Sequence, residues 1–291
     1  FRNLNRLFLY QMETGAFNDM TIETGLGGNL YPRYQENLEL SASIVDYDND
    51  GFQDVFVGGW GVTTKLFRQA KGLKFVDVTE QIKIEIPISG NNGIWADVDI
   101  DGDLDLYLTN EHGENKLYIQ SPDETFIDKS REFGVNNSEI SQSASFADVD
   151  LDGYPDLYVC NWESPDVFYR NIDGTHFKRI NLPLIHLTKK LNSNGVQFGD
   201  IDNDGDLDLL VTDRQGNSRI YLNECVSGGE WKFNDWNIES GINNRFPSYS
   251  GLIADFDNDG WQDIFFSNIG PNLFFRNQQD GLFKQIYQED I

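Results

Sequence analysis

Short runs of apolar residues recur along the chain and are separated by turns rich in Gly, Asn and Asp. Runs of this length between turn residues predict β-strands rather than helices. In five places a bulky residue and then a compact one stand directly before an acidic turn: Ile44-Val45, Trp95-Ala96, Phe146-Ala147, Phe198-Gly199 and Ile253-Ala254. This alternation predicts a crowded strand with one face packed on a neighbouring unit.

Each acidic turn is followed by three more predicted strands. Second strands are expected at 54–57, 105–108, 156–159, 208–211 and 263–266, and third strands at 65–68, 116–119, 167–170, 219–222 and 273–276. Fourth strands are expected to begin at Phe75, Phe126, Phe177, Phe233 and Phe283. Four antiparallel strands that recur with a fixed period describe a blade of a β-propeller.

The start of the chain breaks this period, because residues 6–9 and 17–21 match the third and fourth strands of a unit without its first two. We therefore predict one all-β domain over residues 1–291, a β-propeller with a half blade at about 1–27. Five whole blades are expected at about 36–80, 87–131, 138–182, 190–239 and 245–291. Propellers close to remove sheet edges, so we expect preceding sequence and a parent ring of six or seven blades.

The acidic turns share one phrase, which returns at steps of 51, 51, 52 and 55 residues. Aspartates stand at positions 1, 3, 5 and 9, and glycine at position 6 permits a sharp turn. The predicted metal ligands are Asp46, Asp48, Asp50, Asp54, Asp97, Asp99, Asp101, Asp105, Asp148, Asp150, Asp152, Asp156, Asp200, Asp202, Asp204, Asp208, Asp255, Asp257, Asp259 and Asp263. Backbone carbonyls at position 7 are predicted to add a ligand each: Phe52, Asp103, Tyr154, Asp206 and Trp261.

Calcium is the cation that these loops fit best, because it takes about 6–8 oxygen ligands and accepts several carboxylates. We expect about five Ca²⁺ ions. An EF-hand would need Glu at position 12 and flanking helices, whereas position 12 here is Val57, Leu108, Val159, Val211 or Phe266. Magnesium, and acidic turns that hold no metal, are the alternatives.

The formal charge of −26 limits the kinds of partner that the chain can bind. Nucleic acid binding depends on Lys and Arg, and the sequence has no basic stripe, so we expect no nucleic acid partner. We also expect no direct membrane insertion, because no apolar run is long enough. Five divalent cations would bring −26 only to −16. The two cysteines, Cys160 and Cys225, fall at different positions of different units and are expected to be buried free thiols.

The acidic loops, together with fourth strands of the form Phe-x-Asp such as 17–19, 75–77, 126–128 and 233–235, resemble the FG-GAP/VCBS repeats of integrin α-subunit propellers and secreted bacterial proteins. The unit with Phe177-Lys178-Arg179 lacks that fourth-strand aspartate. The resemblance implies structural calcium on one face and ligand binding on the opposite face. It also implies an extracellular, cell-surface or periplasmic location.

The connections from second to third strands lie on that opposite face. They contain four candidate ligand-binding residues: Trp60, His112, Trp162 and Arg214. Exposed Trp beside Arg can stack on a sugar ring or anchor a protein partner. These residues can equally serve the fold, by covering blade edges.

Three functions fit the sequence. The first is a non-catalytic recognition or adhesion module, stabilised by calcium, for a protein or glycan ligand. The second is a propeller-based polysaccharide lyase or glycoside hydrolase, although the chain has three His and no nucleophile elbow. The third is a structural spacer of a larger secreted protein, whose further domains would be its partners. No catalytic residues are predicted.

Overall fold

The computed structural model of the chain describes residues 6–26, 39–60, 64–85, 89–225 and 229–287. Strands and turns make up nearly all of these residues. The described part contains two four-residue helices, α1 (Thr21–Thr24) and α2 (Ile185–Thr188). The prediction of an all-β chain is confirmed.

The strands form one hairpin and five groups of four antiparallel strands in sequence order. The hairpin is β1 (Phe8–Gln11) and β2 (Ala16–Asp19). The groups are β3 (Glu39–Val45), β4 (Asp54–Trp60), β5 (Lys65–Ala70) and β6 (Lys74–Asp77); β7 (Ser89–Ala96), β8 (Asp105–Asn110), β9 (Lys116–Gln120) and β10 (Phe126–Asp128); β11 (Ile140–Ala147), β12 (Asp156–Ser164), β13 (Val167–Ile172) and β14 (His176–Ile180); β15 (Leu191–Gly199), β16 (Asp208–Asp213), β17 (Arg219–Asn223) and β18 (Phe233–Asp235); β19 (Ser248–Ala254), β20 (Asp263–Asn268), β21 (Leu273–Asn277) and β22 (Phe283–Ile286).

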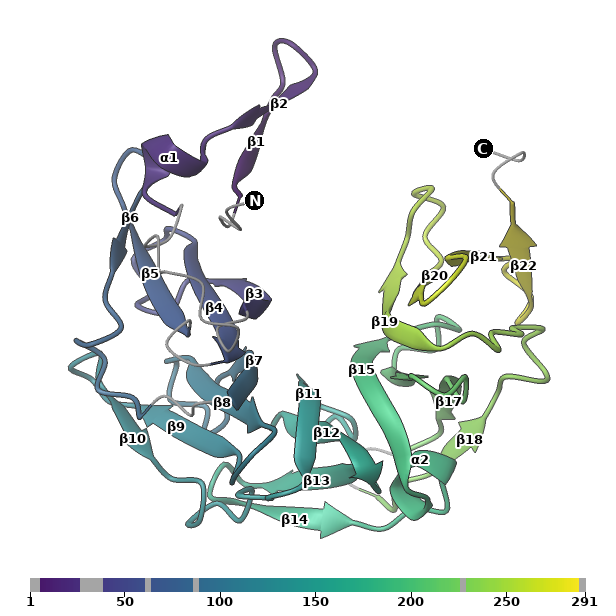
Figure 1. Ribbon diagram of the computed structural model, residues 1–291. Helices are drawn as coiled ribbons and strands as arrows, with labels where there is room; N and C mark the ends of the chain where they lie inside the picture. The colour runs from purple at the N-terminus through teal and green to yellow at the C-terminus, as the bar shows by residue number, and fades with distance from the viewer. Residues whose placement is uncertain (1–5, 27–38, 61–63, 86–88, 226–228, 288–291) are drawn as a thin grey trace.

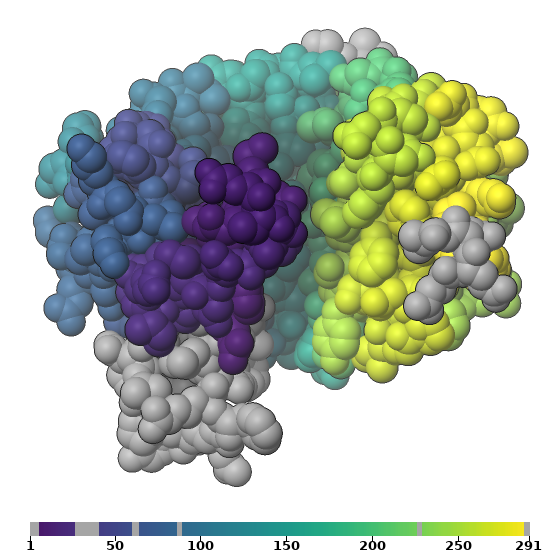
Figure 2. Space-filling model, turned by 90° about the horizontal axis from the view of Figure 1, so that it is seen from above, coloured from purple at the N-terminus to yellow at the C-terminus, as the bar shows by residue number. Residues whose placement is uncertain are grey.

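The five groups follow one another around an open arc, with β1 and β2 near one end and β22 at the other (Figure 1). The space-filling view shows the same separation between the N-terminal hairpin and the last sheet (Figure 2). Two short strand pairings join neighbouring groups: β4 pairs with β7, and β12 pairs with β15. Curled four-stranded antiparallel sheets in this order are the blades of a β-propeller.

The hydrophobic core lies between neighbouring sheets and follows the predicted alternation. Trp95 packs edge-on against Phe56 of the preceding sheet, with ring centroids 5.8 Å apart. Phe146 packs on Tyr107 in the same way at 6.2 Å. Ile44 occupies the equivalent position in the first sheet but is 70% exposed, because no four-stranded sheet precedes it among the described residues.

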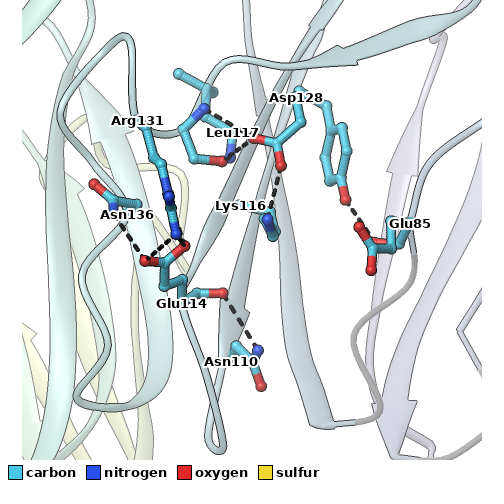
Figure 3. A network of polar contacts seen from close by, with 10 residues as sticks. Glu85, Asn110, Glu114, Lys116, Leu117, Asp128, Arg131 and Asn136 are labelled. Carbon is cyan, nitrogen blue, oxygen red and sulfur yellow. Dashed lines mark hydrogen bonds and ion pairs between the residues drawn. The ribbon is translucent and has the colours of Figure 1, made fainter.

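The fourth-strand aspartate of the Phe-x-Asp pattern fastens the outer hairpin of a sheet. Asp128 accepts hydrogen bonds from Lys116 Nζ at 2.7 Å and from the backbone N–H of Ser130 at 3.0 Å (Figure 3). Asp77 and Asp235 make the matching ion pairs with Lys65 and Arg219. Two units lack this aspartate and have Arg179 or Gln285 in its place. In both, the basic partner is also replaced, by Val167 and Leu273.

The two N-terminal runs form a hairpin, and both cysteines are free thiols. The two N-terminal runs pair as β1 and β2, with Phe8 opposite Asp19. Cys160 is a buried free thiol, whereas Cys225 is free but half-buried. None of the helices in the described ranges is long and apolar enough to cross a membrane.

Candidate metal sites and ligand-binding face

Five acidic loops connect the first and second strands of the sheets, and we number them 1 to 5: residues 46–54, 97–105, 148–156, 200–208 and 255–263. Their backbones share two left-handed residues. Position 6 is glycine with φ between 85 and 99°, and position 4 has φ between 54 and 60°. Ile100 and Leu151 adopt this conformation at position 4, although bulky residues disfavour it. The turn is therefore imposed by the other contacts of the loop.

Aspartates at positions 1 and 5 hold the turn together. The position-1 carboxylate accepts a hydrogen bond from the backbone N–H of the glycine at 2.9–3.2 Å in all five loops. The position-5 carboxylate accepts one from the N–H of position 7 at 2.9–3.1 Å. These bonds do not use the second carboxylate oxygen at position 5 or the carboxylate at position 3. Both are left for other partners.

The position-9 aspartate ties the loop to the sheet and is at most 1% exposed in every copy. One of its oxygens accepts the N–H of position 2 at 2.8–3.2 Å. The other accepts an N–H of the third strand at 2.7–2.9 Å. Burial raises the pKa of this carboxyl, to about 6 at Asp54, about 7 at Asp105 and about 8 at Asp156. A bound cation would oppose this shift by favouring the ionised form.

Each loop gathers three carboxylates that can offer oxygens within 4.8 Å of one another. The groups are Asp46, Asp48 and Asp50; Asp97, Asp99 and Asp101; Asp148, Asp150 and Asp156; Asp200, Asp202 and Asp208; and Asp255, Asp257 and Asp259. Position 9 thus joins the group in loops 3 and 4, whereas Asp54, Asp105 and Asp263 are not in these groups. The position-7 carbonyls remain predicted ligands.

The loops fit a hard divalent cation. Asp99, Asp150 and Asp202 at position 3 each have a buried Oδ1 with no hydrogen-bond partner among the described residues. Burial and then the neighbouring aspartates raise the pKa of Asp99 and Asp202. Unpaired buried oxygens in an all-oxygen donor set are what Ca²⁺ would satisfy.

Arginines of the third strands enter three of the loops, a feature that the sequence interpretation missed. Arg68 Nε lies 2.7 Å from Asp48, Arg170 lies 2.6 Å from Asp150, and Arg276 Nε lies 3.1 Å from Asp257. The recurrence of Arg at the fourth residue of three third-strand runs was the available signal.

Asparagines that follow this position link loops 3, 4 and 5 to the loop before each of them. The side-chain amides of Asn171, Asn223 and Asn277 donate to the position-2 carbonyls of the preceding loops, Val98, Val149 and Ile201, at 2.8–2.9 Å. Because their backbone N–H groups also bond the position-9 aspartates, one residue joins two loops.

A cavity of about 620 Å³ lies at the end of the sheets opposite the acidic loops. The first strands of all five sheets contribute to it. Its lining comprises Ser41, Asn91, Asn92, Glu111, Gln142, Ser143, Ala144, Trp162, Asn194, Gly195, Val196, Arg214, Tyr249, Ser250 and Gly251. Strands from every sheet thus converge on one polar hollow.

Two of the four predicted ligand-face residues meet in this cavity. The Arg214 guanidinium lies over the ring of Trp162 at 5.1 Å and over the ring of Tyr249 at 4.5 Å. Its Nη2 also donates to the Tyr249 hydroxyl at 3.2 Å. Trp162 Nε1 is buried without a hydrogen-bond partner in the described part of the chain. The sequence interpretation missed Tyr249, which lies on a first strand rather than in a connection.

Neither of the other two candidates is placed in this cavity by the described residues. His112 is not among the lining residues, and its backbone N–H donates to the side-chain oxygens of Asn110 in its own turn and of Ser89 on β7. Trp60 ends β4 opposite Ser89, and its side chain lies outside the described residues.

The repeats match a known family model. Residues 46–108, 97–159 and 148–211 match the FG-GAP-like repeat. Cartilage acidic protein 1 of Homo sapiens is 25% identical over 188 residues, which are 60% of this chain and 28% of that protein. The Xenopus tropicalis protein of the same name is 22% identical over 90% of this chain and 45% of its own length. The chain thus spans less than half the length of these curated relatives.

A solved structure shares the fold. It is a lectin of Agrocybe aegerita, described as recognising non-reducing terminal N-acetylglucosamine. The TM-score is 0.60 at 16% identity, over 96% of this chain and 72% of that one. At this identity the likeness concerns the fold alone.

Proposed function

The chain belongs to the FG-GAP-like repeat family, and we propose that it is a calcium-stabilised, non-catalytic recognition module. Its acidic loops hold Ca²⁺ as a structural ion, and its ligand, a protein or a glycan, binds at the opposite end of the sheets. An extracellular setting is supported by the curated relatives, whose name associates them with cartilage.

The observation that carries this proposal is the stacked group of Trp162, Arg214 and Tyr249 in the cavity. Tyr249 is 46% exposed and Arg214 is half-buried, so part of each side chain is open to a ligand. Aromatic and arginine side chains dominate binding energy at recognition sites, and aromatic rings stack on the apolar faces of sugars. Amide groups of Asn92, Gln142 and Asn194 provide hydrogen-bonding partners around them.

The cavity does not favour the enzyme alternative. Glu111 is the one carboxylate among the described lining residues, and Gln142 donates a hydrogen bond to it at 2.8 Å. Glycoside hydrolysis generally uses two carboxyl groups about 5–9.5 Å apart. Recognition therefore accounts for the residues better than hydrolysis.

The test is a screen of the calcium-loaded chain against an immobilised glycan array and an array of extracellular matrix proteins. We expect binding that falls at least tenfold in Trp162→Ala and Arg214→Ala. Tyr10→Ala and Arg131→Ala remove an exposed aromatic and an exposed arginine outside the cavity, and serve as matched controls. Equal loss in the controls, or binding that survives both cavity variants, would overturn the assignment of this face.

A further inference from the structure

The five acidic loops fall into two classes that alternate along the chain. In loops 1, 3 and 5 an arginine of the third strand contacts the position-3 aspartate: Arg68, Arg170 and Arg276. In loops 2 and 4 the equivalent residue is aliphatic, Ile119 or Leu222. The third strands have the same register against the second strands, with Tyr118, Tyr169 and Tyr221 opposite Leu106, Leu157 and Leu209, so these positions correspond in space.

Position 7 of the loops varies together with this residue. Loops 1, 3 and 5, which have the arginine, carry an aromatic residue there: Phe52, Tyr154 or Trp261. Loops 2 and 4, which lack it, carry a fifth aspartate, Asp103 or Asp206. Four aspartates and one arginine leave a formal charge of −3, whereas five aspartates leave −5.

The arginines occupy the space that a cation would compete for. In loop 3, Arg170 Nη2 lies 2.6 Å from Asp150 and 3.2 Å from Asp152, which are predicted ligands. Asp150 is 1% exposed, and Trp231 Nε1 also donates to it at 2.9 Å. In loop 1, Arg68 lies 2.7 Å from Asp48 and 3.6 Å from Asp50. A fixed positive charge at this distance repels a divalent cation and already compensates the carboxylates.

Loops 2 and 4 have no arginine contact of this kind among the described residues. Buried carboxylate oxygens that accept no hydrogen bond within the described structure occur in loops of both classes, at Asp46, Asp48 and Asp150 as well as at Asp99, Asp202 and Asp206. The difference between the classes is therefore the arginine and the fifth aspartate, Asp103 or Asp206. A divalent cation that enters either loop meets a formal charge of −5 rather than −3 and displaces no arginine.

We propose that loops 2 and 4 are the tight Ca²⁺ sites, and that Arg68, Arg170 and Arg276 act as internal counter-ions that weaken loops 1, 3 and 5. This inference rests on the proposed function, in which the loops hold Ca²⁺. It adds that the chain saturates in two stages, with two ions bound before the other three.

The test is a calcium titration of the whole chain by isothermal calorimetry after chelation and buffer exchange. We expect two sites at least tenfold tighter than the remaining ones. Arg170→Leu copies Leu222 into loop 3 and should create a third tight site. Leu222→Arg makes the reciprocal change and should leave one.

Arg179→Leu is the matched control, because it removes an exposed arginine of β14 that lies on the neighbouring strand of the same sheet. It should leave two tight sites. Five equivalent sites in the unmodified chain, or an unchanged number of tight sites in both loop variants, would overturn the two-class inference alone. Absence of any calcium heat would overturn the proposed structural role of calcium as well.

Discussion

The two ends of the sheets differ in how their residues vary from one unit to the next. At the acidic-loop end, the same backbone hydrogen bonds to positions 1, 5 and 9 recur in five copies. At the opposite end, one structural position is filled by Thr64, Asn115, Asp166, Ser218 or Asn272, each accepting a backbone N–H of the second strand or its end. A repeated end that fixes the blade leaves the other end free to diverge, and the cavity lies there.

Removing the cations should have the largest effect, because it acts on all five loops together. Each site contributes about 2.7 kcal/mol when calcium exceeds its Kd a hundredfold. We expect EDTA to lower Tm by about 10 °C or more and added Ca²⁺ to restore it, as measured by scanning calorimetry. A melting curve that EDTA leaves unchanged would end the claim that the loop end depends on metal.

Asp156→Ala should be the most damaging single change at the loop end. The substitution leaves the buried N–H groups of Val149 and Asn171 without their acceptor. Each unpaired N–H lowers the free energy of unfolding by about 1–3 kcal/mol. Denaturant unfolding in EDTA isolates this part from metal binding. Asp204→Ala, at an exposed position, is the control and should cost far less in EDTA. Equal losses would mean that position 9 has no structural role beyond the cation.

Asp166→Asn should stabilise the opposite end at alkaline pH. Burial raises the pKa of Asp166 to about 8, so the fold favours its protonated form. The contribution of this raised pKa to the free energy of unfolding is greatest below about pH 4, where the group is protonated in the unfolded chain too. It is lost progressively as pH rises from about 4 to about 8. Asn115 occupies the same position in the preceding sheet and shows that an amide fits there. Its side chain accepts the backbone N–H of Asn110 and hydrogen-bonds to Tyr107, in the way that Asp166 hydrogen-bonds to Tyr158.

The measurement compares Tm of Asp166→Asn with the unmodified chain at pH 5 and pH 9. We expect a gain of several degrees at pH 9 and a smaller one at pH 5. Asn115→Asp is the reciprocal control and should lose stability, more at pH 9 than at pH 5. A pH-independent difference in both variants would show that ionisation of this position does not matter.

Arg214→Ala should have the smallest effect on stability, although it is expected to reduce ligand binding. Its stacking on Trp162 and Tyr249 is partly exposed, and such contacts contribute about 0.5–1 kcal/mol. We expect Tm to fall by no more than about 3 °C. A larger fall would place Arg214 among the residues that hold the fold, and would weaken the separation between the two ends.

The loop end was largely predictable from the sequence, because its residues act through local spacing. The Asp and Gly positions imply a turn, and the apolar runs after the loops coincide with the starts of the second strands. The first strands begin at least five residues before the runs predicted for them, because polar and glycine residues continue those strands. Left-handed Asn49, Asn203 and Asn258 at position 4 could also have been predicted, since asparagine tolerates that conformation.

The contacts between sheets were not predictable in the same way. Arg170 stands in a third strand and resembles any surface arginine until the fold brings it to Asp150. Tyr249 and Trp162 lie far apart in the chain and meet through Arg214 because β16 lies against β19 and β12 pairs with β15, the strand before β16. Local patterns contain no information about such meetings between distant segments.

The asparagine link between successive loops has a consequence for the history of the chain. Asn171, Asn223 and Asn277 present the same amide to the same carbonyl of the unit before them. The last three units therefore contact the unit before them through the same hydrogen bond. Duplication of the 52 residues from loop 3 to loop 4, which carry both Val149 and Asn171, would thus repeat this hydrogen bond between the new neighbours.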